Sequence, residues 1–123
     1  MGITLEREAT RNEVAEETRR RLEHLTNFLG NNRVASLLNV SRSQPSRWRR
    51  GQEGMSSESS ALVLDLDYVL TRFRQVYDNA DLFWTWLNSE NPFVGARAID
   101  AITQRGPQAV MPAVEALAEG AYV

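Results

Sequence analysis

The chemically most informative part of this 123-residue sequence is a cluster of positive charge near its middle. Residues 31–54 contain one acidic residue, Glu53, and five arginines: Arg33, Arg42, Arg47, Arg49 and Arg50. The segments on either side are net acidic, and the whole chain carries a net charge of −2. A basic island between acidic flanks favours a local contact with a polyanion. The arginine fork suits bidentate bonds to bases and carboxylates.

The residues needed for catalysis or metal binding are largely missing. The chain has no cysteine, which excludes a thiol nucleophile, a disulfide and a zinc–thiolate site. His24 is the single histidine and lies among charged residues, so we expect it at the surface without a catalytic role. Asp65 and Asp67 stand two apart on an expected helix and diverge, so they make no carboxylate pair. We predict a protein that is not an enzyme and has no metal site or cofactor.

Helical spacing of apolar residues runs through nearly the whole chain, and this predicts an all-α fold. Gly30, Gly51 and Gly106 are expected helix stops, and Asn79 is an expected N-cap. Pro112 should bend or break the last helix. The expected helices cover about 6–29, 33–38, 42–50, 59–77, 80–87, 96–104 and 107–119. The small polar segment 52–58 resembles a linker, and we divide the chain into 1–54, a connecting helix in 55–80, and 81–123.

The segment that contains the basic island has a recognisable pattern. Residues 34–51 read Val-Ala-Ser-Leu-Leu-Asn-Val-Ser-Arg-Ser-Gln-Pro-Ser-Arg-Trp-Arg-Arg-Gly, which resembles the helix-turn-helix of the Xre/phage-repressor family. Asn39 holds a turn position that needs a left-handed backbone, which asparagine tolerates. We expect Val40 to plug the turn, Ser41 to cap the second helix and Trp48 to face the core.

This resemblance implies an N-terminal Xre-like DNA reader. Its second helix would present Arg42, Ser43, Gln44 and Arg47 to base edges, with Arg47 able to bind guanine bidentately. The phosphate contacts would come from Arg33, Arg49 and Arg50. Pro45 departs from the pattern, because it falls where helical hydrogen bonding normally begins, and it predicts a late or tilted helix start. A helix-turn-helix kept only as a scaffold, with solvated arginines, is the alternative.

A second pattern fills the C-terminal part. It has a Trp-Leu before an Asn-Pro turn, then Gly, Arg, a small apolar helix and a Gly stop, followed by a last helix and a terminal Gly. Its residues are Leu82-Phe83-Trp84-Thr85-Trp86-Leu87-Asn88-Ser89-Glu90-Asn91-Pro92, Gly95-Ala96-Arg97-Ala98-Ile99-Asp100-Ala101-Ile102, Gly106, Val110, Leu117 and Gly120. This pattern resembles the Xre/MbcA/ParS toxin-binding domain, with Ala98 where that family usually has Pro.

The two resemblances together cover about ninety residues and imply an antitoxin. Its partner would be a RES-domain toxin, a NAD-degrading enzyme whose active site the antitoxin covers with its C-terminal end. The residues implied in toxin binding are Trp84, Trp86, Arg97, Glu119, Gly120, Ala121, Tyr122 and Val123. Because Trp84 and Trp86 are two apart, they should face different sides of their helix, one in the core and one partly exposed.

Two other functions remain open from the sequence. The chain would otherwise be a plain transcriptional regulator whose C-terminal half only dimerises, or a scaffold protein that acts without a toxin. We expect operator DNA and a homodimer, or a higher hetero-oligomer with the toxin, among the partners. No apolar run approaches the length of a membrane span, the first residues lack the plan of a secretory signal, and the cytoplasm is the expected location.

Overall fold

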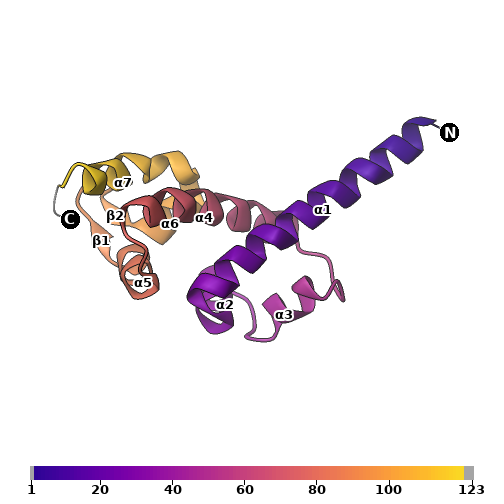
Figure 1. The fold of residues 1–123 in the computed structure, drawn as a ribbon, viewed down its shortest axis with the longest axis horizontal. Helices are drawn as coiled ribbons and strands as arrows, with labels where there is room; N and C mark the ends of the chain where they lie inside the picture. Colours follow the sequence, from indigo (N-terminus) through magenta and orange to yellow (C-terminus); the bar gives the residue numbers. More distant parts are fainter. Residues whose placement is uncertain (1, 121–123) are drawn as a thin grey trace.

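A computed structural model gives the fold of residues 2–120, with the backbone alone described for residues 2–9. Figure 1 shows an elongated molecule in which the N-terminal helices lie toward one end and the C-terminal helices toward the other. They are α1 Gly2–Leu29, α2 Asn31–Leu38, α3 Gln44–Arg49, α4 Ser57–Val76, α5 Ala80–Asn88, α6 Ala98–Arg105, the 3-10 helix η1 Pro107–Ala109 and α7 Met111–Ala118. The all-α prediction is confirmed. The sequence did not predict the short antiparallel pair of β1 Glu90–Asn91 with β2 Ala96–Arg97, in which Glu90 faces Arg97.

Helix α4 is shared by the two halves of the chain. Its N-cap, Ser56, accepts a hydrogen bond from the Ser59 amide at 3.1 Å, which satisfies one of the free donors at the helix start. Residues spaced by three and four along α4 are buried, and the helix packs against α1, α2, α6, η1 and α7. The buried side chains of the N-terminal and C-terminal helices therefore form one hydrophobic cluster.

An aromatic group joins α1, α4 and α5 inside this cluster. Phe73 of α4 is fully buried, with ring centroids 4.9 Å from Phe83 and 5.4 Å from Trp86. Phe28 of α1 lies 6.4 Å from Phe83 on the other side. Tilted rings at these separations add to the stabilisation that comes from apolar burial alone.

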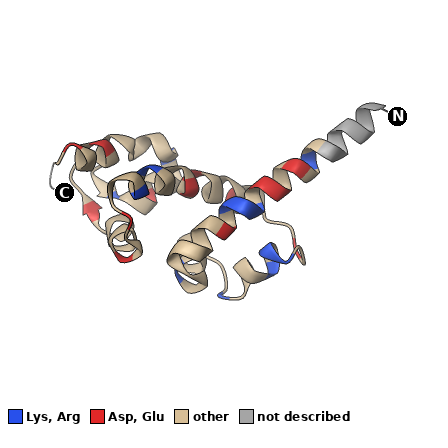
Figure 2. Cartoon of the chain, viewed as in Figure 1, with Lys and Arg blue, Asp and Glu red and all other residues tan. Residues whose placement is uncertain are grey.

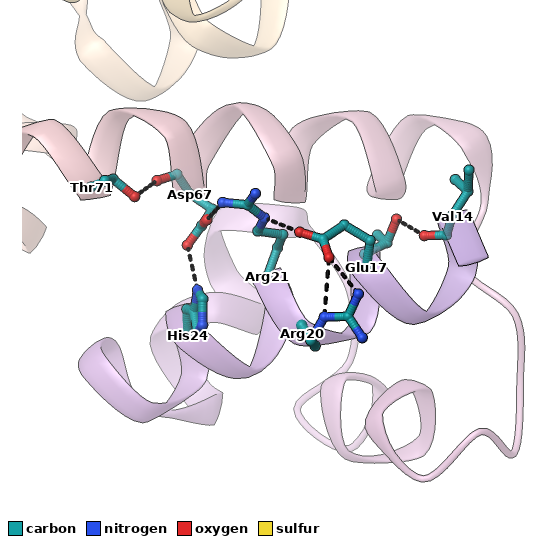
Figure 3. Close-up of polar contacts among 8 residues, drawn as sticks. Val14, Glu17, Arg20, Arg21, His24, Asp67 and Thr71 are labelled. Carbon is teal, nitrogen blue, oxygen red and sulfur yellow. Dashed lines mark hydrogen bonds and ion pairs between the residues drawn. The ribbon is translucent and has the colours of Figure 1, made fainter. Parts of the chain in front are cut away.

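A buried carboxylate links α1 to α4 (Figure 3). Asp67 is 1% exposed and accepts a hydrogen bond from Arg21 Nη1 at 2.8 Å. His24 Nδ1 lies 3.5 Å from the other carboxylate oxygen. The side chain of His24 is 61% exposed, as expected of a surface residue, although the contact with Asp67 was not foreseen. Asp65 is half-buried, and the expectation that it forms no carboxylate pair with Asp67 stays a prediction.

The turn between α2 and α3 has the predicted left-handed residue. Asn39 has φ 56° and ψ 48°, the only positive φ of a non-glycine residue in the described part of the chain. The predicted N-cap is wrong, however. Helix α3 begins at Gln44, after Ser43, and Ser41 lies outside it. Pro45 explains the late start, because a proline lacks an amide proton and fits only the first turn of a helix.

A second proline also changes a predicted helix. The segment expected as one helix over 107–119 is divided into η1 and α7, and Pro112 stands in the first turn of α7. Pro112 would have clashed with the preceding turn of a continuous helix. The predicted break is confirmed, and it lets Val110 turn inward as a fully buried residue.

Helix α1 begins earlier than expected, and its N-terminal end projects beyond the remaining helices (Figure 1). Val14, in the N-terminal part of this helix, is 57% exposed. Val14 is exposed because it lies before the buried part of α1, which begins at Thr18 and continues through Leu22 and Leu25.

We predict that Phe73→Ala destabilises the fold by about 3–5 kcal/mol, because it opens a cavity between α4 and α5. The free energy of unfolding in urea measures this. Phe93→Ala is the matched control: Phe93 is 55% exposed, so the loss of its ring should cost less than about 0.5 kcal/mol. Equal losses for the two variants would contradict the placement of Phe73 at the centre of the core.

Candidate nucleic-acid and partner-binding surfaces

Two arginines of the basic island point into solvent without a partner. Arg42 in the turn before α3 and Arg50 at its end are exposed, and neither side chain has a hydrogen bond or ion pair to the described residues. Figure 2 shows α3 at an outer edge of the molecule, away from the C-terminal helices. These two side chains are available to phosphate oxygens.

Three of the four residues expected to read bases, Ser43, Gln44 and Arg47, are bound to one another, whereas Arg42 stays apart from them. Arg47 donates from Nη1 to Ser43 Oγ and from Nη2 to Gln44 Oε1, each at 2.6 Å. Gln44 Nε2 donates to Glu53 Oε2 at 2.8 Å, and Arg47 Nε lies 3.2 Å from Glu53 Oε1. The last contact is an ion pair without hydrogen-bond alignment, so the buried Nε–H has no hydrogen-bond acceptor among the described residues. The network holds the four side chains together on the outer side of α3.

Arg49, expected at a phosphate, instead ties α3 to the start of α2. Its Nη2 donates to Asn31 Oδ1 at 2.9 Å and to Ser46 Oγ at 3.2 Å. Asn31 Nδ2 also lies 3.3 Å from Ser46 Oγ. Arg49 is half-buried, and these bonds show that it positions α3 against α2.

Arg33, the other expected phosphate contact, joins α2 to α5. Its Nη1 donates to Asp81 Oδ1 at 2.9 Å, and its guanidinium lies 5.3 Å from the centroid of the Trp84 ring. A cation over an aromatic face is favourable. This contact therefore connects a residue predicted to bind DNA with one predicted to bind a toxin.

The two tryptophans of α5 divide as predicted. Trp86 is buried against Phe73 and Phe83, with 8% of its surface exposed, whereas Trp84 is half-buried under Arg33. Trp86 Nε1 is buried and has no hydrogen-bond partner among residues 2–120. Trp86 is thus a core residue, with little surface for a partner. The sequence left open which tryptophan would be buried, since the answer depends on where α4 packs.

Three further residues of the expected toxin surface are exposed. Arg97 donates from Nε to Asp100 Oδ2 at 2.8 Å, and these bonds lower the pKa of the Asp100 carboxyl from its usual value. Glu119 and Gly120 follow α7 in solvent. Ala121, Tyr122 and Val123, which the sequence also assigned to toxin binding, lie outside the described residues.

An apolar groove lies at the end of the molecule where the described chain stops. It has a volume of about 520 Å³, and Tyr77, Leu82, Leu117 and Gly120 are among its lining residues. Tyr77 and Leu82 are 44% and 41% exposed, so the rim of the groove presents apolar surface to solvent. The sequence missed this groove, because Tyr77, the C-cap of α4, and Leu82 of α5 come from different elements.

A second apolar area lies on the side formed by α1 and α4. Val14, Leu64 and Tyr68 are exposed there. Leu64 lines two neighbouring hollows, one with Tyr68 and Met111 and the other with Val14 and Met55. The two helices thus leave part of their apolar surface unpaired.

No group of three or more acidic, histidine or cysteine side chains in the described part of the chain is placed to hold a metal ion. None of the helices described here is both long enough and apolar enough to cross a membrane. A comparison with family models, with curated proteins and with solved structures finds no match to this chain. Its function is therefore inferred from the resemblances in the sequence and from the surfaces described above.

Proposed function

We propose that this chain is an antitoxin that binds a RES-domain, NAD-degrading toxin through its C-terminal half and operator DNA through α3. The observation that carries the proposal is the apolar groove beside Gly120, at the end of the domain that resembles a toxin-binding domain. Exposed apolar patches with polar surroundings are typical of protein–protein contacts. The proposed toxin contacts, Arg97, Glu119 and the residues after Gly120, belong to the same half of the chain.

Inhibition is proposed to come from the C-terminal end. The last residues follow directly from Gly120, a residue that lines the groove, so a toxin seated on this groove brings its surface next to them. Tyr122 has a rigid apolar ring with one polar tip, which suits an anchor in a cleft. The end of the chain would thus cover the site where the toxin binds NAD.

The DNA-binding part of the proposal is supported by the outer side of α3. Arg42 and Arg50 have free guanidinium groups there, and Ser43, Gln44 and Arg47 lie between them. Phosphate contacts from the outer arginines would fix the position of the helix, and the central side chains would meet base edges. An antitoxin with such a reader would repress its own operon and act in the cytoplasm, where DNA and NAD are found.

The second candidate function is a plain regulator whose apolar surfaces serve only self-association. The exposed Val14, Leu64 and Tyr68 on α1 and α4 favour a homodimer in both proposals. These three residues line hollows that are separate from the groove lined by Tyr77 and Leu82. The two apolar areas can therefore be tested one at a time.

Deletion of Gly120 to Val123 should abolish protection from the toxin and leave the protein folded. Gly120 is exposed and makes only a backbone bond to Leu117 at 3.0 Å, so little core is lost. A growth assay with co-expressed toxin measures protection, and circular dichroism with melting measures folding. Cells that still grow with the truncated chain at normal levels would show that the tail is not the inhibitory element.

Leu82→Glu should prevent capture of the toxin in a pull-down, because it places a charge on the rim of the apolar groove. Leu64→Glu is the matched control: Leu64 is 38% exposed on the other apolar area. That variant should still capture the toxin but shift the protein from dimer to monomer in light scattering at tens of micromolar. If Leu82→Glu captures the toxin as well as the unchanged protein does, the groove is not the toxin-binding surface.

Arg50→Ala should weaken binding to duplexes of any sequence alike and reduce the slope of log affinity against log salt by about one. The loss of one phosphate contact is the reason. Titration of a labelled duplex at several salt concentrations measures both quantities. Arg105→Ala, which removes the same charge from the last turn of α6, should leave the slope unchanged. An unchanged slope for Arg50→Ala would contradict DNA binding by α3.

A further inference from the structure

Glu53 contacts two side chains of α3 that the proposed DNA reader would use to contact bases. It is the only acidic residue between 31 and 54, and its two oxygens contact the two side chains best suited to read bases. One oxygen accepts from Gln44 Nε2 at 2.8 Å, and the other lies 3.2 Å from Arg47 Nε. Guanine would offer Arg47 two acceptors of the same kind.

The chain brings Glu53 to this position by turning sharply after α3. Gly51 has φ 73°, a left-handed value that favours glycine. The Gln52 amide donates to the Arg47 carbonyl at 3.0 Å, so the segment folds back along the helix. The turn thus holds a carboxylate beside the outer side of α3, where the proposed DNA would lie.

All three nitrogens of the Arg47 guanidinium face acceptors of this chain. Nη1 and Nη2 donate to Ser43 and Gln44, and Nε faces Glu53. A bidentate bond to a base needs two adjacent N–H groups of one arginine. A base that binds the Nε edge of Arg47 must therefore displace Glu53.

The contact with Glu53 is suited to exchange. Arg47 and Glu53 are 36% and 51% exposed, and ion pairs at such exposure contribute little to stability. The buried Arg47 Nε–H also lacks an aligned acceptor, so a base that supplies one would improve its bonding. Phosphates nearby would in addition repel the Glu53 carboxylate.

We propose that Glu53 is an intramolecular competitor of DNA, which holds Arg47 and Gln44 until a base edge displaces it. This inference rests on the proposed DNA binding by α3. It makes Glu53 a determinant of both affinity and specificity, since only a sequence that offers good acceptors to Arg47 compensates for the lost contacts. On mixed-sequence DNA, Glu53 would keep its contacts with Arg47 and Gln44. Only Arg42 and Arg50 would then bind the DNA, through its phosphates.

The test is a double-mutant cycle on duplex affinity at low salt. Glu53→Gln should bind mixed-sequence duplex about two- to five-fold more tightly, which is the range expected from the loss of one exposed ion pair. In an Arg47→Ala background the same change should have a much smaller effect, because Glu53 then holds only Gln44 and no longer blocks an arginine. Glu58→Gln is the control, since Glu58 is an exposed acid in the first turn of α4 with no bond to α3.

The outcomes separate this inference from the proposed function. If Glu53→Gln tightens binding equally with and without Arg47, the effect is one of net charge and the competitor role is overturned. The competitor role is also overturned if Glu53→Gln does not tighten binding. If Arg50→Ala still weakens binding in that case, the proposed DNA binding by α3 is retained. If no variant binds duplex at low salt, DNA binding by α3 and the competitor both fail.

In the free protein, the Arg47 Nε–H proton should exchange with solvent more slowly than the Arg42 Nε–H proton. Equal exchange rates would contradict the contact between Arg47 and Glu53.

Discussion

The apolar residues of α4 are buried by helices from both halves of the chain at the same time, and the other elements depend on this packing. Helices α2 and α3 have eight and six residues, and isolated helices shorter than about 12–15 residues are marginal in water. They are stable here because Val34, Leu37, Leu38 and Trp48 join the cluster formed with α1 and α4. Helices α5 to α7 are equally short and depend on Phe73 and its neighbours in the same way. The N-terminal helices α1 to α3 and the C-terminal helices thus share one core.

The same arrangement determines which charges face solvent. Arg33 is drawn to α5 by Asp81 and Trp84, and Arg49 is drawn to the start of α2 by Asn31 and Ser46. Five arginines in sequence therefore become two free guanidinium groups, at Arg42 and Arg50, and one that is held in a network, at Arg47. A basic segment with few free charges binds nucleic acid more weakly and more selectively than its composition suggests.

The sequence predicted the features that depend on near neighbours. The left-handed Asn39, the buried Trp48 and the break at Pro112 follow from local backbone rules, and all three are present. The late start of α3 was expected from Pro45, although the cap was then placed on Ser41, which the turn leaves outside the helix. The partners of Arg33 and the position of Asp67 beside Arg21 were not predicted. They join residues more than forty positions apart, and no local spacing rule reports such contacts.

The apolar groove was hidden from the sequence for the same reason. Its lining residues come from α5, from β1 and from the ends of α4 and α7, whereas the pattern of residues 82–120 predicted the helices and not the hollow between them. The proposal of a RES-domain toxin as partner rests on that pattern, and the proposed place of contact rests on the groove.

The central claim is that this chain inhibits a NAD-degrading enzyme by direct binding. The most direct measurement is the rate of NAD consumption by the purified RES-domain protein, expected to be encoded beside this chain, as the chain is added. We predict that the rate falls to background at a fixed molar ratio of the two proteins. A rate that stays constant at a large molar excess of the folded chain would contradict the antitoxin assignment.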